Sequence, residues 1–231
     1  MSKVLVIADT HLPATYPTYL TFCKDMYKEW KCNKVVHIGD VFDWAALGFW
    51  QTNPDLPSAE DEHALCVNFI KPWVKAFPKM HICIGNHDAR LYRKAFAAGI
   101  PVRHLPTYNK LTGTPRGWKW VRSVDIDDVH YTHGTGRGGS YPAVNKSRWE
   151  GRSVVVGHVH HACGIQWSFS GHTGFFGMSV GAGVDDKHAC FDYATENDKK
   201  SALGVGIVWN GQPYWERMPC GDGEPYHRSK A

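Results

Sequence analysis

Four short runs of mostly apolar residues recur along the first two thirds of the chain. They occupy residues 4–8, 35–38, 81–84 and 154–156, and all four contain valine or isoleucine. Continuous apolar runs of this length, without alternation of polar positions, are typical of strands that are buried on both faces. The pattern therefore predicts interior strands of a parallel sheet.

Longer mixed stretches lie between these runs, and two of them, residues 16–30 and 59–71, predict helices. Ser58 and Asp61 have the spacing of a capping box at the start of the second helix, with acidic residues in its first turn. Leu65 and Phe69 are four residues apart and are expected to share its apolar face. Pro72 lacks a backbone donor and is expected to end or kink this helix.

The alternation of strands and helices indicates an α/β protein with a mostly parallel sheet. Beyond residue 162 glycine is frequent, and two runs, residues 203–209 and 213–218, flank an Asn-Gly pair. This arrangement predicts a hairpin and a second, more antiparallel sheet. Because the chain has no internal repeat and no linker-like segment, we expect one domain over residues 1–218 and a flexible tail over residues 219–231.

The composition excludes several classes of protein. Apolar residues make up 43% of the 231 residues and charged residues 21%, which argues against a disordered or fibrous chain. The net charge of +4 permits an anionic substrate but does not by itself indicate nucleic acid. The seven cysteines are odd in number and none has C-x-x-C spacing, which favours a cytoplasmic protein. No early apolar run is long enough for a signal peptide or a membrane span, so no membrane partner is expected.

The sequence contains 14 histidines, and several of them follow the predicted strands together with aspartate or asparagine. A further run at residues 129–132 ends at another histidine. Ligands bind beyond the carboxyl ends of strands in open α/β sheets, so these side chains should converge. The candidate metal ligands are Asp9, His11, Asp40, Asn86, His133, His158 and His160.

Such a ligand set can hold two divalent metal ions. Two cations about 3.5–4 Å apart can clamp the attacking and leaving oxygens of a phosphoryl displacement and activate a water. A carboxylate can bridge two metals, whereas a neutral imidazole offers one acceptor nitrogen, so an aspartate is the natural shared ligand. Manganese is the favoured metal, and iron, zinc or nickel would also suit mixed oxygen and nitrogen ligands.

Five segments in order, at residues 9–11, 39–43, 85–88, 133–134 and 157–160, read DTH, GDVFD, GNHD, HG and GHVH. They resemble the motifs of the calcineurin-like metallophosphoesterases. The resemblance spans residues 9–160, about two thirds of the chain. It implies an α/β fold in the form of a four-layer αββα sandwich, in which two mixed sheets are flanked by helices.

The resemblance also implies a role for each motif residue. Asp9, His11 and His160 would hold one metal, Asn86, His133 and His158 the other, and Asp40 would bridge them. A bridging hydroxide would attack phosphorus, and His87, helped by Asp88, would protonate the leaving oxygen. His130 is an alternative to His133, because the motif that contains His133 is only two residues long.

Departures from related families narrow the activity. Protein phosphatases of the superfamily carry an arginine where this chain has Trp44, so a phosphoesterase that prefers diesters is expected instead. DNA nucleases of the superfamily share the Asn-His-Asp motif but add a capping domain, for which 231 residues leave little room. Because the motif is shared, a nuclease is nevertheless kept as an alternative, with nucleic acid as its substrate. Non-catalytic scaffolds of this fold have lost metal ligands, whereas this chain keeps the full set.

Two arginines are candidates for contacting the substrate phosphate. They are Arg90, close to the third motif, and Arg137, in a glycine-rich loop at residues 134–139. That loop matches G-x-G-x-x-G, but no acidic residue ends the following strand, which disfavours a dinucleotide site. Histidines outside the motifs, such as His161 and His188, are taken as surface or hydrogen-bonded residues. The oligomeric state is left open.

Overall fold

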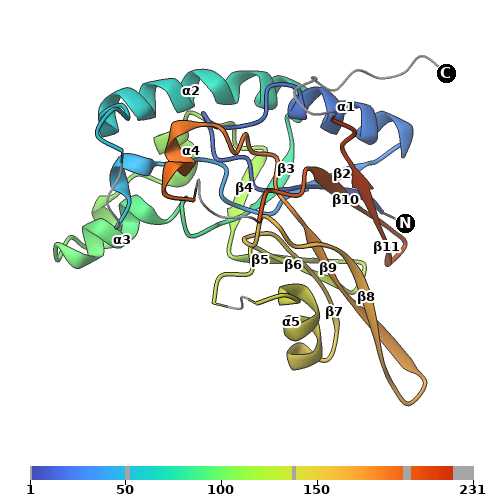
Figure 1. The fold of residues 1–231 in the computed structure, drawn as a ribbon. Coiled ribbons are helices and arrows are strands. Elements are labelled where there is room, and N and C mark those ends of the chain that lie inside the picture. The colour runs from blue at the N-terminus through green and yellow to red at the C-terminus, as the bar shows by residue number, and fades with distance from the viewer. Residues whose placement is uncertain (1, 50–52, 137–138, 195–198, 221–231) are drawn as a thin grey trace.

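The computed structural model describes residues 2–49, 53–136, 139–194 and 199–220, and it contains two mixed sheets flanked by helices (Figure 1). The first sheet has the strand order β11-β10-β1-β2-β3-β4. Its strands are β1 (Lys3–Ile7), β2 (Lys34–His37), β3 (Met80–Cys83), β4 (Trp118–Val121), β10 (Gly204–Trp209) and β11 (Gln212–Arg217). The first four pair in parallel, and β10 and β11 are antiparallel additions beside β1.

The second sheet has the order β5-β6-β7-β9-β8. Its strands are β5 (Ser123–Ile126), β6 (Val129–Thr132), β7 (Ser153–Val156), β8 (Cys163–Ser170) and β9 (Thr173–Val180). The central strands β6, β7 and β9 are parallel, and the two edge strands are antiparallel to their neighbours. The predicted α/β class and the arrangement of two mixed sheets with flanking helices are therefore confirmed.

Helices cover the outer faces of both sheets (Figure 1). The first sheet is covered by α1 (Tyr19–Glu29) and α2 (Ala59–Ala76), whose aromatic residues Tyr19 and Trp73 pack with ring centroids 6.1 Å apart. The second sheet is covered by α5 (Pro142–Glu150), where Ala143 packs in one cluster with Val154 and Val156. The remaining helices are α3 (Arg90–Ala97), α4 (Tyr108–Thr112), η1 (Ala45–Leu47), η2 (Val102–His104) and η3 (Ala189–Ala194). None of the described helices is both long and apolar enough to cross a membrane.

The main core contains buried residues of both sheets and of the helices α1 and α2. Gly206 of β10 brings its backbone against Met178 and Val180 of β9, where an added Cβ would lie 2.8–2.9 Å from their side chains. The thiol of Cys83 in β3 donates a hydrogen bond to the carbonyl oxygen of Tyr131 in β6 at 3.4 Å. These contacts fix the position of one sheet relative to the other. They therefore bring the strand ends of the two sheets next to each other.

The predicted hairpin near the end of the chain is present, but it belongs to a different sheet from the one expected. Strands β10 and β11 pair as a hairpin, and β10 continues the first sheet by antiparallel pairing with β1. The physical reason is burial, because residues 204–208 are all buried and need apolar neighbours on both faces. The second sheet takes its antiparallel edge from the β8–β9 hairpin instead.

Two expectations for α2 also need correction. Leu65 and Phe69 are 40% and 49% exposed, and the buried face carries Glu62, Cys66, Ile70 and Trp73. Glu62 can be buried because its carboxylate accepts backbone hydrogen bonds from Ala45 and Ala46 of η1. Pro72 does not end the helix, which continues to Ala76. The capping interaction is confirmed, since the Ser58 hydroxyl accepts a hydrogen bond from the backbone N–H of Asp61 at 3.2 Å.

The expected tail at residues 219–231 falls almost wholly on residues 221–231, which lie outside the described residues. Within the described range, Met218 is fully buried and donates a backbone hydrogen bond to Leu203. Residue 218 is therefore part of the folded unit.

Candidate metal centre

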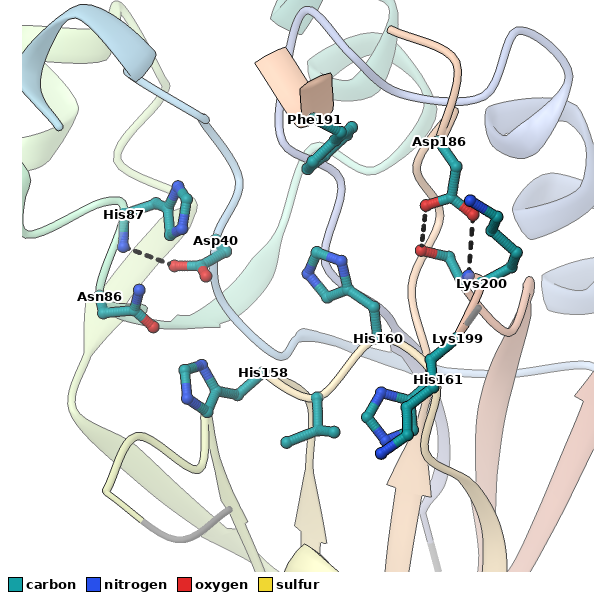
Figure 2. Close-up of a pocket in the computed structure, with 12 residues that line it drawn as sticks. Asp40, Asn86, His87, His158, His160, His161, Asp186, Phe191, Lys199 and Lys200 are labelled. Atoms are coloured by element: carbon teal, nitrogen blue, oxygen red, sulfur yellow. Dashed lines mark hydrogen bonds between the residues drawn. The ribbon is translucent and has the colours of Figure 1, made fainter. Parts of the chain in front are cut away.

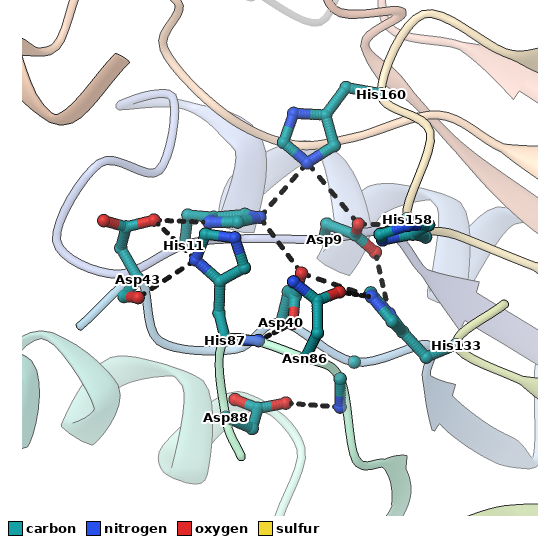
Figure 3. A network of polar contacts seen from close by, with 12 residues as sticks. Asp9, His11, Asp40, Asp43, Asn86, His87, Asp88, His133, His158 and His160 are labelled. Carbon is teal, nitrogen blue, oxygen red and sulfur yellow. Dashed lines mark hydrogen bonds and ion pairs between the residues drawn. The ribbon is translucent and has the colours of Figure 1, made fainter. Parts of the chain in front are cut away.

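The polar residues that follow the strands come together at one edge of the two sheets (Figure 3). Asp9, Asp40 and Asn86 follow the parallel strands β1, β2 and β3 of the first sheet. His133 and His158 follow the parallel strands β6 and β7 of the second sheet. The carboxyl ends of these strands therefore supply ligands from both sheets, as the sequence pattern predicts.

The ligand atoms form two groups. Asp9, His11 and His160 make one group, and Asp40, His133 and His158 make another; within each group the ligand atoms lie within 4.8 Å of one another. Asn86 joins the second group, because its Oδ1 lies 3.0 Å from Nε2 of His133.

Asp40 lies between the two groups. Its Oδ2 is 3.6 Å from Nε2 of His11 and 3.2 Å from Nε2 of His133. One carboxylate thus faces a histidine of each group, which is the geometry that a bridging ligand requires. A third group that the geometry allows, His11, Asp40 and His87, shares two of the same residues.

An unsatisfied oxygen indicates that this cluster is built for cations. Oδ1 of Asp9 is buried and has no hydrogen-bond partner among the described residues. A buried carboxylate oxygen without a partner is costly, and a bound cation would remove that cost. The surrounding donors are imidazole nitrogens and carboxylate oxygens, which suit first-row divalent metals. The residues present therefore fit metal ions.

Hydrogen bonds behind the ligands fix the direction of their rings. Nδ1 of His11 lies 2.8 Å from Oδ1 of Asp43, and Nδ1 of His133 lies 3.1 Å from the carbonyl oxygen of Ile38. In both histidines this leaves Nε2 pointing into the cluster. A partner on the second ring nitrogen selects the tautomer and raises the basicity of a metal-binding histidine.

The loops that carry the ligands have unusual backbone conformations. His11, Asp40 and His158 have φ values of +43°, +48° and +68°, a region that residues other than glycine seldom adopt. Such conformations persist only where the surrounding structure enforces them, and they concentrate at functional sites.

Two glycines give the carboxylates room. A Cβ at Gly85 would lie 2.0 Å from Oδ1 of Asp40, and a Cβ at Gly157 would lie 2.3 Å from Oδ1 of Asp9. Each glycine directly precedes a ligand residue, so the two loops can pass against the carboxylates of the neighbouring strands. The glycines in GNHD and GHVH are therefore required because a larger residue would collide with the carboxylates of Asp40 and Asp9.

The cluster strongly favours positive charge. Burial would raise the pKa of Asp40, but His133, His87 and His11 together outweigh it and hold this pKa well below its usual value. Burial lowers the pKa of His133, yet the charges of Asp40 and Asp9 raise it to about 10. His11, in contrast, has its pKa lowered to about 4, mainly by burial. A divalent cation would take the place of the proton that the carboxylates hold on His133, so metal binding should release protons.

His87 lies at the rim of the cluster. Its backbone N–H donates to Oδ1 of Asp40 at 2.8 Å, and its Nδ1 lies 3.0 Å from Oδ1 of Asp43. Burial lowers the pKa of His87, but the charge of Asp40 and the contact with Asp43 raise it above the usual value. The imidazole of His87 faces the site and lines a cavity of about 350 Å³ together with Asp40 and Asn86 (Figure 2).

The carboxylate next to His87 is Asp43, which the sequence reasoning left without a role. The hydrogen bonds described for Asp88 go to backbone N–H groups, including those of Val41 and Gly85 at 3.0 Å each. Asp88 thus ties two ligand loops together, and none of its described hydrogen bonds reaches His87. Asp43 is the last residue of the GDVFD motif, and that position was the available signal.

Arg90 lies behind His87. Its guanidinium donates to the carbonyl oxygens of Asp43 and Trp44 at 2.8 and 3.1 Å, and one of its nitrogens lies 3.2 Å from Nε2 of His87. Arg137 lies outside the described residues. His130, the alternative to His133, is paired with Asp125 on the neighbouring strand β5, whereas His133 is in the cluster.

A sequence profile decides the family. The profile of the calcineurin-like phosphoesterases matches residues 2–174, about three quarters of the chain. The chain is a member of the calcineurin-like phosphoesterase family. Members of this family act on phosphoesters and use divalent metals, in agreement with the clustered ligands of this member. The matched segment contains all seven candidate ligands.

Solved structures with a similar fold have low sequence identity to this phosphoesterase. A metallophosphoesterase from Sphaerobacter thermophilus is 14% identical, with 94% of this chain and 88% of that chain covered and a TM-score of 0.49. An archaeal phosphodiesterase is 14% identical, with coverage of 94% and 99% and a TM-score of 0.47. Vps29 from Chaetomium thermophilum is 10% identical, with coverage of 98% and 94% and a TM-score of 0.48. No match to a curated protein sequence was found.

Proposed function

We propose that this chain is a phosphodiesterase that works with two divalent metal ions, of which manganese is favoured. The observation that carries this proposal is the position of Asp40, whose Oδ2 faces a histidine of each ligand group. Asp9, His11 and His160 would hold one ion and Asn86, His133 and His158 the other. Two bound ions would supply an activated water and neutralise the charge that builds up on the phosphoryl oxygens.

His87 is proposed as the group that protonates the leaving oxygen. It lies at the rim of the cavity and its imidazole is 12% exposed, so a substrate can reach it. Asp40 and Asp43 raise its pKa, which favours the protonated form that a proton donor needs. Arg90, in contact with the same imidazole, is proposed to hold its orientation rather than to bind phosphate.

The setting proposed for this activity is the cytoplasm. All seven cysteines are free thiols, and a reducing compartment preserves that state. The preference for diesters over protein phosphomonoesters is supported by Trp44, which is buried and stacks on Phe42 with ring centroids 5.8 Å apart. An apolar ring thus occupies the position after Asp43, and a buried indole cannot neutralise a doubly charged phosphate.

The test of the proposal uses two substrates that differ in their leaving group. Bis-p-nitrophenyl phosphate releases a stable phenolate, whereas thymidylyl-thymidine releases an alkoxide that needs a proton. With manganese present, His87→Ala should lower kcat on thymidylyl-thymidine by about a hundredfold or more. The loss on bis-p-nitrophenyl phosphate should be several-fold at most, because that leaving group departs without protonation.

A half-buried histidine on α2, His63→Ala, serves as the control and should leave both rates unchanged, since it lies outside the metal cluster. Equal losses on the two substrates in His87→Ala would remove His87 as the proton donor. A protein that binds two equivalents of manganese but hydrolyses neither substrate would support a non-catalytic scaffold instead.

A further inference from the structure

The cavity above the metal ligands extends beyond them. At the end away from Asn86 and His87 it is lined by His161, Lys199 and Lys200 (Figure 2). His161 lies in the turn after His160, and the two lysines lie in the segment that precedes β10. The segment with the lysines is outside the part of the chain that matches the family profile. None of the three was assigned a role in the metal centre.

The segment that carries the two lysines is held firmly beside the site. The carboxylate of Asp186 accepts hydrogen bonds from the backbone N–H and the hydroxyl of Ser201, at 2.8 and 2.6 Å. The next residue, Ala202, donates its backbone N–H to the carbonyl oxygen of His160 at 2.8 Å. Asp186 also lines the cavity. The chain directly after Lys199 and Lys200 is thus tied to Asp186 and to the loop that carries His160.

A second cavity, of about 620 Å³, adjoins the first. The two share His161 and Lys199 among their lining residues. The second cavity continues along the start of β8 and the N-terminal end of α5, where Tyr141 lines it and is 66% exposed. The two cavities thus adjoin at a histidine and a lysine, with an exposed aromatic ring in the second, and we refer to the pair as the groove.

We propose that the second cavity is a binding site for a single-stranded oligonucleotide that continues from the scissile phosphate in the metal centre. Lys199 and His161 contact the next phosphate along the strand, and Tyr141 stacks with a base. This inference rests on the proposed function, and it adds the substrate class and three specificity-determining residues.

The chemistry of the groove matches such a strand. A single-stranded nucleic acid combines regularly spaced negative charges with flat bases, and proteins bind it through cations that follow the backbone and aromatic rings that stack on bases. The groove presents these features in order, with the Lys199 cation and the His161 imidazole at the junction of the two cavities and Tyr141 in the second cavity. A small diester with a single phosphate would fill the metal cavity and leave the second cavity empty.

The first experiment compares substrates with one phosphate and with several, using the full-length, manganese-loaded protein. Lys199→Ala should raise KM for tetrathymidylate by about three- to tenfold and leave kcat nearly unchanged. The kinetics on thymidylyl-thymidine, which has one phosphate, should not change. Lys187→Ala is the matched control, because this exposed lysine lies in the same connection between β9 and β10 but lines neither cavity among the described residues.

The second experiment measures binding without turnover. Fluorescence anisotropy with a labelled phosphorothioate tetrathymidylate, which resists hydrolysis, gives Kd at several salt concentrations. Lys199→Ala should weaken binding and reduce the slope of log Kd against log salt by about one, as expected for the loss of one phosphate contact. Tyr141→Ala should weaken binding at least about fivefold with the slope unchanged, and Tyr141→Phe should restore it because the ring is kept.

The outcomes separate this inference from the proposed function. If thymidylyl-thymidine is hydrolysed but the Lys199 and Tyr141 variants bind and cleave tetrathymidylate like the unmodified protein, the second cavity is not an oligonucleotide site. If the oligonucleotide binds with the predicted dependence on Lys199 and Tyr141 but no diester is cleaved, the binding site stands and the phosphodiesterase activity is overturned. Equal effects of Lys187→Ala and Lys199→Ala would reduce the interaction to general surface charge and would also overturn the proposal.

Discussion

The carboxylate of Asp43 contacts two histidines. Its Oδ1 lies 2.8 Å from Nδ1 of His11, a metal ligand, and 3.0 Å from Nδ1 of His87, the proposed proton donor (Figure 3). The two imidazoles pack edge to face with centroids 4.4 Å apart. A single side chain therefore sets the orientation of the ligand and the proton affinity of the acid, so the two properties should change together when it is altered.

Replacing this carboxylate should change both the rate and its pH dependence. We expect Asp43→Asn to lower kcat on thymidylyl-thymidine by about ten- to a hundredfold, as is typical when the partner of a metal-binding histidine is lost. Asp43 helps to raise the pKa of His87, so the variant should have a lower pKa at that residue. Because protonated His87 is the active form, activity should begin to fall at a lower pH than in the unmodified protein. The measurement is kcat as a function of pH.

Asp88→Asn is the control for this prediction. Asp88 is also a buried carboxylate, but its described hydrogen bonds go to backbone N–H groups of the ligand loops. Its replacement should lower the free energy of unfolding and leave the fall of kcat with pH in place. A pH profile that moves in Asp88→Asn and stays fixed in Asp43→Asn would show that the roles are reversed.

At the scale of single residues, the sequence indicates the metal ligands well and their partners poorly. All seven candidate ligands follow strands, and the geometry brings all of them to one cluster. The sequence suggests Asp88, the next residue, as the carboxylate that assists His87. In the structure the Asp88 side chain instead accepts hydrogen bonds from the backbone N–H groups of residues 41 and 42. Which of two nearby carboxylates contacts an imidazole depends on loop geometry, which residue order does not specify.

At the scale of elements, the metal centre depends on loops that follow the strands and pack closely against one another. Gly157 follows β7 directly, and its Cα lies against both Asp9 and Ile38 of the other sheet. The loop after β7 thus crosses from the second sheet to the first and delivers His158, whose backbone N–H donates to Oδ2 of Asp9 at 2.8 Å. The glycine is what allows this crossing.

Gly157→Ala should therefore damage the site through crowding. The new Cβ would lie 2.3 Å from Oδ1 of Asp9 and 2.4 Å from Cγ2 of Ile38, so one loop must shift. We expect a loss of about 1–3 kcal/mol in the free energy of unfolding, as for other overpacked sites, together with weaker manganese binding. Urea denaturation and metal titration measure the two effects.

Gly99→Ala separates crowding from backbone strain. Gly99 has a φ of +74°, but an added Cβ would meet no atom within 4 Å. This control should lose about 1–2 kcal/mol from strain alone and keep its affinity for manganese. Unchanged metal affinity in Gly157→Ala would mean that the loop after β7 can move without disturbing Asp9.

Helices and strands could be predicted from the sequence where the local pattern determines them. Features that depend on contacts between distant segments could not. The apolar runs correspond to β1, β2, β3 and β7, and Ser58 caps α2 as expected. The buried face of α2 was assigned to Leu65 and Phe69, because the burial of Glu62 depends on N–H groups of a different segment. The sheet to which the last hairpin belongs depends likewise on its pairing with β1, almost 200 residues away in sequence.

At the scale of the whole molecule, the ligand set is divided between the two sheets. Asp9, His11, Asp40 and Asn86 belong to connections of the first sheet, and His133, His158 and His160 follow strands of the second. Asp40 and His133 meet across this boundary with 3.2 Å between Oδ2 and Nε2. Bound cations would therefore join the two sheets, and their binding energy should contribute to the stability of the entire fold.

Metal binding should raise the thermal stability. Manganese at a hundredfold excess over Kd should add about 2.7 kcal/mol to the free energy of unfolding for each ion bound. For a chain of this length each ion corresponds to a rise in Tm of roughly 5–10 °C over the protein treated with EDTA. Differential scanning fluorimetry gives the shift, and elemental analysis should find two equivalents of metal.

Asp40→Asn tests whether this gain comes from the proposed centre. The variant loses the carboxylate that faces both ligand groups, so manganese should raise its Tm by only a small fraction of the shift in the unmodified protein. A full shift in Asp40→Asn would place the stabilising metal elsewhere on the molecule.

The division of the ligands between the two halves of the chain has a consequence for biosynthesis. A nascent polypeptide that has left the ribosome only as far as residue 132 contains Asp9, His11, Asp40 and Asn86, but none of the three later histidines. Such an intermediate cannot assemble either complete ion-binding group, since each of them needs a histidine from the second half. The proposed activity would thus arise only after the chain as far as His160 has left the ribosome.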